Sequence, residues 1–298
     1  MIWIHGGNFF DGASSIYPGD VLAAMKDVVV VTINYRTNAF GFLSNSDSLA
    51  GNYGLWDQQL AIRWVKKNIK DYGGDKRSIT LFGESAGAHS ITCHMISDKT
   101  PKNLFKRAIT QSGSIVSLRL LSISPLPSYL DIGSRTNCTV SPDPVACLKS
   151  LPMSSLVHAS ANLNFFPTLD NDFLSRSLLL ELAIFISNNY SPVPSLYLQR
   201  LTNYDILSGW NSLEGMVFTE VLSAVNQQTT GNSLSNGVSE EVFKNALHLL
   251  TRGSFAEAGE LIINMTVHFY INNPRPMFSD GRSNDDRRVE AFVNVMGK

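Results

Sequence analysis

The chain has 298 residues, of which 24 are Lys or Arg and 25 are Asp or Glu, and its formal net charge is -1. This balance argues against a nucleic-acid-binding protein, which needs a concentrated basic face, and a hydrophobic content of 44% is too high for a disordered chain. The most apolar stretch, Leu178–Ile186, is too short to span a membrane and contains Glu181.

Strand and helix patterns alternate over the first third of the chain. We predict strands at Ile2–Ile4, Val28–Ile33, Ile79–Phe82 and Ala108–Thr110, and helices at Leu55–Ile69 and Ala86–Ile96. The β-branched run Val28–Ile33 is typical of a strand buried on both faces, whereas Asn34–Gly54 is rich in Asn, Ser and Gly and is predicted to be a loop. This alternation predicts an α/β fold with a mostly parallel sheet flanked by helices.

The later part of the chain is less regular. Two segments are predicted to be loops, the proline-containing Ser122–Pro144 and the polar Gln227–Gly237. A further strand is predicted at Tyr204–Leu207, and helices are predicted at Leu174–Ile186, Glu240–Leu250 and Phe255–Tyr270.

The strongest chemical signal is the motif Gly83-Glu84-Ser85-Ala86-Gly87. A bare G-x-S-x-G motif arises easily by chance, but this one follows a predicted strand and precedes a predicted helix, which is the context that a nucleophile elbow requires. Small residues are needed beside the serine because the turn is tight. The alternative is a Gly-Ser turn that caps a helix, and the context makes it less favoured.

A second motif, His5-Gly6-Gly7-Asn8, follows the first predicted strand. Enzymes with a nucleophile elbow form their oxyanion hole from the N–H that follows the serine and from N–H groups of an HGG-type loop. Taken alone, the motif is better explained as an ordinary tight turn.

Together these motifs and their flanking blocks resemble the type-B carboxylesterases, a family that includes the cholinesterases and the catalytically silent neuroligins. The resemblance is dense over residues 1–115 and can be followed to the end of the chain. It rests on Trp3-Ile4-His5-Gly6-Gly7, Asn34-Tyr35-Arg36, Phe40-Gly41-Phe42-Leu43, Gly51-Asn52-Tyr53-Gly54-Leu55 through Asp57-Gln58, Trp64-Val65 to Asn68-Ile69, and Tyr72-Gly73-Gly74-Asp75 running into the elbow.

The resemblance implies an α/β-hydrolase fold that hydrolyses small-molecule carboxylic esters without a metal or another cofactor. Ser85 is then the nucleophile, and the backbone amides of Gly7, Asn8 and Ala86 are the oxyanion donors. Asn8 departs from the family, which usually has Gly or Ala there, and its side chain could narrow the site. Asn38 replaces a usual Gly, a mild change because Asn tolerates left-handed backbone.

The acid of the triad is expected between the serine and the histidine in the chain. Gly209-Trp210-Asn211-Ser212-Leu213-Glu214-Gly215 resembles the family motif G-x-N-x-x-E-G, so Glu214 is the predicted acid, which would orient the imidazole. The alternative is a surface glutamate in a loop.

The histidine base is not found where the resemblance places it. Only His248 and His268 follow Glu214, and both lie in apolar helical patterns, while the family's base lies in a Gly-rich loop about a hundred residues after the acid. His5 is expected to be structural, and His89 and His94 lie on the helix after the elbow. We therefore expect residues 1–298 to form a single partial α/β-hydrolase domain, incomplete at both termini, that would be nearly inactive by itself.

The cysteines and glycosylation motifs bear on the compartment. The resemblance implies a disulfide between Cys138 and Cys147, which the loop-entropy relation values at about 2.5–3 kcal/mol, and Cys93 is expected to be a buried free thiol. Asn-x-Ser/Thr motifs occur at Asn137, Asn189 and Asn264. Together these features favour a secreted or lumenal protein.

Three further residues in the matched blocks carry expectations. Arg36 and Asp57 are predicted to form a buried structural ion pair, with simple solvation as the alternative. Glu84 is predicted to tune the site electrostatically or to act as a hydrogen-bonding neighbour of the nucleophile. The aromatic positions near Glu214 are mixed, so a general carboxylesterase is favoured over a choline esterase, with a neuroligin-like adhesion domain and a nonfunctional partial product as the alternatives.

Overall fold

The computed structural model describes residues 1–298 apart from 116–119, 178–180, 182–195, 212–218, 231–237 and 252–298. The chain divides into two compact units, Met1–Gly209 and Trp210–Lys298, which we describe separately. The expectation of one partial domain over residues 1–298 stays a prediction.

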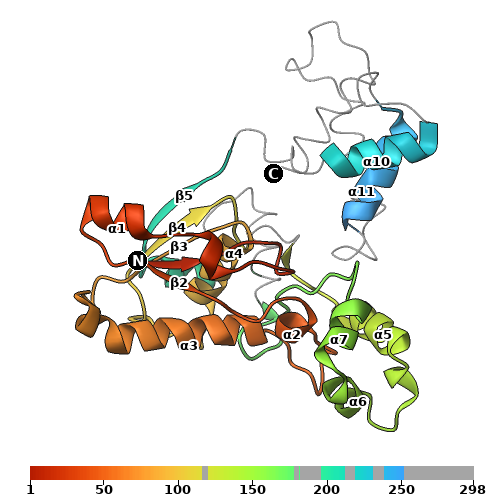
Figure 1. Cartoon of the computed structure of the whole chain (residues 1–298), viewed down its shortest axis with the longest axis horizontal. Coiled ribbons are helices and arrows are strands. Elements are labelled where there is room, and N and C mark those ends of the chain that lie inside the picture. The colour runs from red at the N-terminus through yellow and green to blue at the C-terminus, as the bar shows by residue number, and fades with distance from the viewer. Residues whose placement is uncertain (116–119, 178–180, 182–195, 212–218, 231–237, 252–298) are drawn as a thin grey trace, which may run out of the picture. The chain divides into compact units, whose positions relative to one another are not determined.

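Over its described residues, the first unit is built on a five-stranded sheet (Figure 1). Its strands are β1 (Ile2–Ile4), β2 (Val31–Ile33), β3 (Thr80–Glu84), β4 (Arg107–Gln111) and β5 (Asp205–Gly209). They lie in the order β2-β1-β3-β4-β5, and every pair is parallel. The carboxyl ends of all five strands therefore meet at one edge of the sheet, and the amino ends meet at the other. The predicted α/β architecture is confirmed.

Helices cover the sheet and bury its apolar residues. α4 (Ala86–Ile96) packs on β1, β3 and β4, and α3 (Tyr53–Asn68) packs on α4 and β2. Ile4, Leu81 and Ile91 are fully buried in this core. Shorter elements lie around them: η1 (Ser14–Ile16), α1 (Asp20–Lys26), α2 (Asn38–Phe42), η2 (Ile69–Tyr72) and α9 (Leu196–Leu201).

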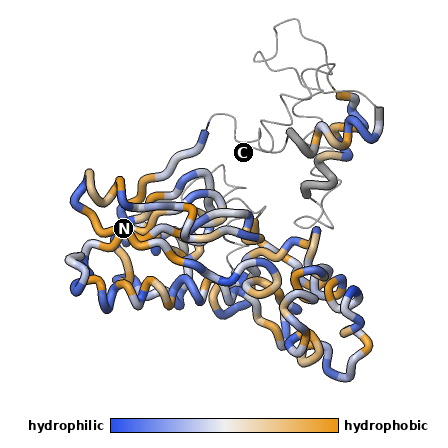
Figure 2. The backbone as a smooth tube through the Cα atoms, viewed as in Figure 1, coloured by the Kyte–Doolittle hydropathy of each residue, from blue (hydrophilic) through white to orange (hydrophobic). Residues whose placement is uncertain are grey.

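The α3 helix shows where the apolar pattern and actual burial differ. Leu55, Ile62 and Val65 are buried, as the helical pattern predicts. Leu60 and Trp64 belong to the same pattern but are 68% and 53% exposed. Orange and blue alternate along α3 in Figure 2, as expected for a helix with one face in the core.

Three loop and strand predictions in the first unit need correction. β2 begins at Val31 rather than Val28, and it lies at the edge of the described sheet, so Val31 and Thr32 are only half-buried. The predicted loop Asn34–Gly54 contains the short helix α2. The predicted loop Ser122–Pro144 contains α5 (Leu126–Arg135) and η4 (Cys138–Val140).

Proline explains why α5 lies in a segment that was predicted to be a loop. Pro127 lies in the first turn of α5, and Pro144 begins α6 (Pro144–Ser150), whose N-cap Asp143 accepts a hydrogen bond from the Ala146 amide at 2.9 Å. The first helical turn tolerates proline because its N–H groups have no intrahelical acceptor. α7 (Met153–Ala159) follows.

The second unit is described mainly through two helices. α10 (Thr219–Thr230) and α11 (Glu240–Thr251) pack against each other and bury Leu222, Val242 and Phe243. α11 confirms the predicted helix Glu240–Leu250, while the predicted loop Gln227–Gly237 overlaps the last turn of α10. Phe255–Tyr270 and most of Leu174–Ile186 lie outside the described residues. No helix in the described part of the chain is long and apolar enough to cross a membrane.

Candidate active site

Ser85 lies in the turn between β3 and α4, at the carboxyl edge of the sheet. Its backbone has φ 53° and ψ -120°, a region that a residue with a Cβ rarely adopts. Two backbone hydrogen bonds hold this turn: the Ser85 amide donates to Gln111 O at 2.9 Å, and the His89 amide donates to Ser85 O at 2.9 Å. The strand–turn–helix context and the strained serine are those of a nucleophile elbow.

The elbow is possible because small residues bring backbones into close contact. Gly83 pairs with Ile4 across β1 and β3. A Cβ added to Gly87 would overlap the carbonyl oxygen of Ile4 and would lie 2.9 Å from His5 O. A Cβ added to Gly113 would overlap Ser85 O. These glycines allow α4 to begin directly behind the serine.

The loop that follows β1 lies beside Ser85. A Cβ added to Gly6 would lie 3.2 Å from the Ser85 Cβ and 2.8 Å from Glu84 O. The next three residues all have positive φ: 104° at Gly7, 57° at Asn8 and 58° at Phe9. Gly7 O accepts hydrogen bonds from the amides of Phe10 at 2.9 Å and Asp11 at 3.2 Å, which closes the turn.

The amides predicted to bind an oxyanion have no competing acceptor. Within the described residues, the N–H groups of Gly7 and Asn8 make no hydrogen bond. Ala86 is the first residue of α4, and its N–H has no intrahelical acceptor. The helix N-terminus also favours negative charge at this position. Gly7, Asn8 and Ala86 stay the predicted oxyanion donors.

Side chains behind the loop hold it in place, and the sequence pattern did not reveal them. His5 is buried, and its Nδ1 donates to Gly6 O at 2.8 Å. Tyr35 donates its hydroxyl to His5 O at 2.8 Å, and the two rings stack at 4.4 Å. Burial raises the pKa of Tyr35, so this hydroxyl stays a donor. Tyr35 lies in a motif block that also contains Arg36, but the contact with His5 depends on the fold.

Both asparagines that depart from the family lie in left-handed backbone. Asn38 has φ 55° and Asn8 has φ 57°. The Asn38 amide donates to Phe9 O at 2.6 Å, which ties the start of α2 to the loop beside Ser85. The Asn8 side chain is exposed. Asn is the non-glycine residue best suited to these angles, so the two departures do not disturb the local backbone.

Of the two glutamates predicted to act at the site, the structure describes Glu84 but not Glu214. Glu84 ends β3 and is exposed, with Oε2 so close to the loop that a Cβ on Gly6 would lie 2.9 Å from it. Glu214 lies outside the described residues, beyond the end of β5. Its role as the acid therefore stays a prediction, as does the role of Glu84 in tuning the site.

None of the histidines with described side chains pairs with Ser85. Within the described residues, Ser85 Oγ makes no hydrogen bond. His89 and His94 are fully buried in α4, and burial lowers the pKa of His89 to about 4 and of His94 to about 3. His158 is exposed on α7. The side chains of His248, on α11, and of His268 lie outside the described part.

Arg36 and Asp57 form the predicted ion pair, but the pair is not buried. Arg36 Nε donates to Asp57 Oδ2 at 2.7 Å, and Arg36 Nη2 donates to Asp57 Oδ1 at 2.8 Å. Their side chains are 53% and 27% exposed, because the loop after β2 meets the first turns of α3 at the surface. The Arg36 amide also donates to Asp57 Oδ2 at 3.0 Å, so the pair pins the backbone of this loop.

The cysteines pair as the resemblance implies. Cys138 and Cys147 form a disulfide with their Cα atoms 5.5 Å apart, and Cys93 is a buried free thiol whose pKa is raised by burial. Asn137, next to the disulfide, is exposed. Asn189 and Asn264 lie outside the described residues. Within the described part of the chain, no group of His, Cys, Asp and Glu could hold a metal ion.

Comparisons with known proteins agree with this geometry. A sequence model of the carboxylesterase family matches residues 1–298. The chain is 34% identical to Neuroligin-3 of Mus musculus over 252 residues, which are 81% of this chain and 28% of that protein. It is 36% identical to Bile salt-activated lipase of Bos taurus over 275 residues, which are 84% of this chain and 42% of that protein.

The match covers a larger share of a third relative. The chain is 34% identical to Cholinesterase 2 of Branchiostoma lanceolatum over 236 residues, which are 73% of this chain and 64% of that protein. The chain thus spans 28% to 64% of the length of these three relatives.

Proposed function

Because this chain belongs to the carboxylesterase family, we propose that the intact protein is a serine carboxylester hydrolase with Ser85 as its nucleophile. The observation that carries the proposal is the strained backbone of Ser85, at φ 53° and ψ -120°, between β3 and the N-terminus of α4. Such strain persists only where the surrounding structure holds it, and it is typical of reactive positions.

The proposed reaction proceeds through an acyl-enzyme. Ser85 Oγ attacks the carbonyl carbon of the ester while a histidine base takes the hydroxyl proton. The carbonyl oxygen becomes an oxyanion that accepts hydrogen bonds from the amides of Gly7, Asn8 and Ala86. The carbon–oxygen bond to the alcohol then breaks, and the alcohol leaves with the proton. Water releases the acid from Ser85 by the same steps.

Glu214 is proposed to orient the imidazole and to stabilise the imidazolium that forms. The base itself has no assignment among residues whose side chains are described. His89 and His94 are unsuitable because both are sealed in the core of α4. His5 is unsuitable because its Nδ1 is committed to Gly6 O and its ring is stacked on Tyr35.

The proposed substrates are small-molecule carboxylic esters, and the reaction needs no cofactor. A secreted or lumenal location of the intact protein is proposed as well. It is supported by the Cys138–Cys147 disulfide and by the exposed Asn-x-Thr motif at Asn137, since disulfides persist in oxidising compartments.

A second candidate is an adhesion domain without hydrolytic activity. The similarity to Neuroligin-3 favours it, because the same fold can serve binding alone. The presence of a serine in the elbow, beside three amides that have no competing acceptor among the described residues, favours the hydrolase.

Hydrolysis of a p-nitrophenyl ester by the intact protein separates the two candidates. Ser85→Ala should lower kcat/KM by about 10⁴-fold or more, and Glu214→Gln by about 10²-fold or more. Ser15→Ala removes the hydroxyl of an exposed serine in η1 and serves as the control. If wild-type protein hydrolyses the ester no faster than Ser85→Ala, the adhesion candidate is the correct one.

A further inference from the structure

A groove in the unit Met1–Gly209 collects positive charge far from the candidate active site. It is lined by twelve residues, of which seven are Lys or Arg and none is Asp or Glu. α3 contributes Arg63, Lys66 and Lys67, and the segments that precede β3 and β4 contribute Lys76, Arg77, Lys102 and Lys106. We call this the cationic groove. The chain as a whole carries a net charge of -1, so these seven cations are a local concentration.

Most of this charge has no carboxylate partner. Arg63 donates from Nε and Nη2 to Gln59 Oε1 at 3.1 and 3.0 Å, and Lys66 donates to Asn103 O. Both acceptors are neutral, so they orient the cations without cancelling their charge. Over the described residues, Lys67, Lys76 and Lys102 form no ion pair.

The remaining two cations have weak partners. Arg77 Nε lies 3.3 Å from Asp75 Oδ1, and Lys106 Nζ lies 3.8 Å from Asp205 Oδ2. All four of these side chains are exposed. Ion pairs of this kind contribute little and exchange readily with another anion.

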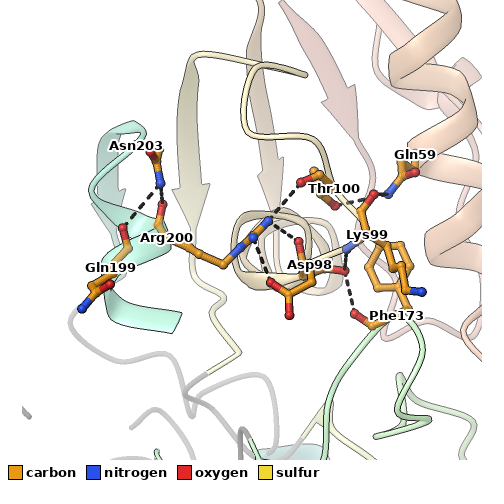
Figure 3. A network of polar contacts seen from close by, with 9 residues as sticks. Gln59, Asp98, Lys99, Thr100, Phe173, Gln199, Arg200 and Asn203 are labelled. Atoms are coloured by element: carbon orange, nitrogen blue, oxygen red, sulfur yellow. Dashed lines mark hydrogen bonds and ion pairs between the residues drawn. The ribbon is translucent and has the colours of Figure 1, made fainter. Parts of the chain in front are cut away.

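The walls of the groove are held firmly. Gln59, which accepts the hydrogen bonds from Arg63, also donates to Lys99 O and to Thr100 Oγ1, both at 3.2 Å. It therefore links α3 to the segment before β4. Figure 3 shows Arg200 of α9 reaching the same segment, where it donates to Asp98 Oδ1 at 2.9 Å and to Thr100 O at 3.0 Å. Leu104 and Phe105, both buried, form the apolar base. These bonds tie the segment that leads into Lys102 and Lys106 to α3 and α9.

Topology separates the groove from Ser85. Arg77 precedes β3, Lys106 immediately precedes β4, and Asn203, which also lines the groove, precedes β5. In a parallel sheet these amino ends share one edge, whereas Ser85 follows the carboxyl end of β3 at the other. An anion in the groove is therefore not a substrate at the elbow.

We propose that the cationic groove binds a sulfated polysaccharide. Exposed ammonium groups spread along an open groove suit a linear polyanion, because they act as point charges and need no enclosing geometry. The Cys138–Cys147 disulfide is typical of an oxidising compartment. Anionic lipid is concentrated in the cytoplasmic leaflet, and nucleic acid is also intracellular, which leaves sulfated glycans as the polyanions such a protein meets.

Binding of size-defined heparin oligosaccharides, measured by calorimetry at several salt concentrations, tests the proposal. The double variant Lys67→Ser/Lys102→Ser should bind about tenfold more weakly or worse, with a shallower dependence of log affinity on log salt. The matched control Lys26→Ser/Lys149→Ser removes the same charge from exposed lysines of α1 and α6 and should bind like wild type. Thermal unfolding of both variants checks that they fold equally.

Equal binding by the two double variants would overturn the site. Equal binding of desulfated heparin, or tighter binding of duplex DNA or phosphatidylserine vesicles than of heparin, would overturn the ligand class. Ser85 reactivity should be unchanged in Lys67→Ser/Lys102→Ser, so the outcome does not depend on the proposed hydrolase function.

Discussion

Gly87 packs so closely on the backbone of Ile4 that an added Cβ would overlap the Ile4 carbonyl oxygen. Ile4 ends β1, and Gly87 is the second residue of α4, so this contact fixes the helix behind the turn that contains Ser85. The strained backbone of the serine is held between this contact and the hydrogen bond from its amide to Gln111 O at 2.9 Å.

Gly87→Ala should therefore destabilise the protein although alanine favours helices. The gain in helix propensity is about 1 kcal/mol, but the overlap with Ile4 should lower the free energy of unfolding by about 3 kcal/mol overall. Chemical denaturation measures this change. Gly209→Ala is the control, because no atom of the described residues lies within 4 Å of a Cβ at that position. A stable Gly87→Ala variant would show that the helix does not pack on β1 as described.

Tyr35→Phe should loosen the loop that follows β1 beside Ser85. It removes the hydroxyl that donates to His5 O at 2.8 Å and leaves a buried carbonyl without that donor, at a cost of about 1–2 kcal/mol. Denaturation should detect the loss, and ester hydrolysis by the intact protein should slow because Gly7 and Asn8 follow His5 directly. Tyr72→Phe, at an exposed tyrosine, should change neither quantity. Unchanged activity in Tyr35→Phe would remove this residue from the support of the site.

The free energy of unfolding should decrease as the pH is lowered from 6.5 to about 4. Burial lowers the pKa of His89 from 6.5 to about 4 and of His94 from 6.5 to about 3, so the unfolded state binds more protons over this range. Each histidine should contribute a slope of up to about 1.4 kcal/mol per pH unit.

Denaturation at a series of pH values measures this slope. His94→Gln should flatten the dependence, whereas His158→Gln controls for the loss of an exposed imidazole. If His94→Gln keeps the full slope, the histidine is not buried in its neutral form.

The Arg36–Asp57 pair should be worth less than a buried ion pair. A double-mutant cycle with Arg36→Ala and Asp57→Ala should give a coupling of about 1 kcal/mol or less, because both side chains are partly exposed. Asp57→Ala should cost more than Arg36→Ala, since the carboxylate also accepts the Arg36 amide at 3.0 Å. A coupling free energy of about 3 kcal/mol would be that of a buried ion pair and would contradict the exposed position.

Local patterns predicted the part of the fold that surrounds Ser85. The helix Ala86–Ile96 matches its prediction at both ends, and β3 and β4 differ from theirs by one or two residues. These elements combine a clear periodicity with glycines at their boundaries, so the local signal and the tertiary fold agree.

Features that depend on tertiary contacts could not be predicted from the sequence. Nothing in the Val28–Ile33 run indicates that its last three residues alone pair with β1. The exposure of Leu60 and Trp64, the surface position of Arg36 and the contact between Tyr35 and His5 all depend on what packs nearby. Glu214 remains predicted from its motif, because it lies outside the described residues.

Ser85 is proposed to be an activated nucleophile. Incubating the intact protein with a fluorophosphonate and mapping the adduct by peptide mass spectrometry tests this most directly. We predict one phosphonylated peptide modified at Ser85, no adduct in Ser85→Ala, and normal labelling in Ser15→Ala. Labelling that persists in Ser85→Ala, or no labelling of folded wild-type protein, would contradict the assignment.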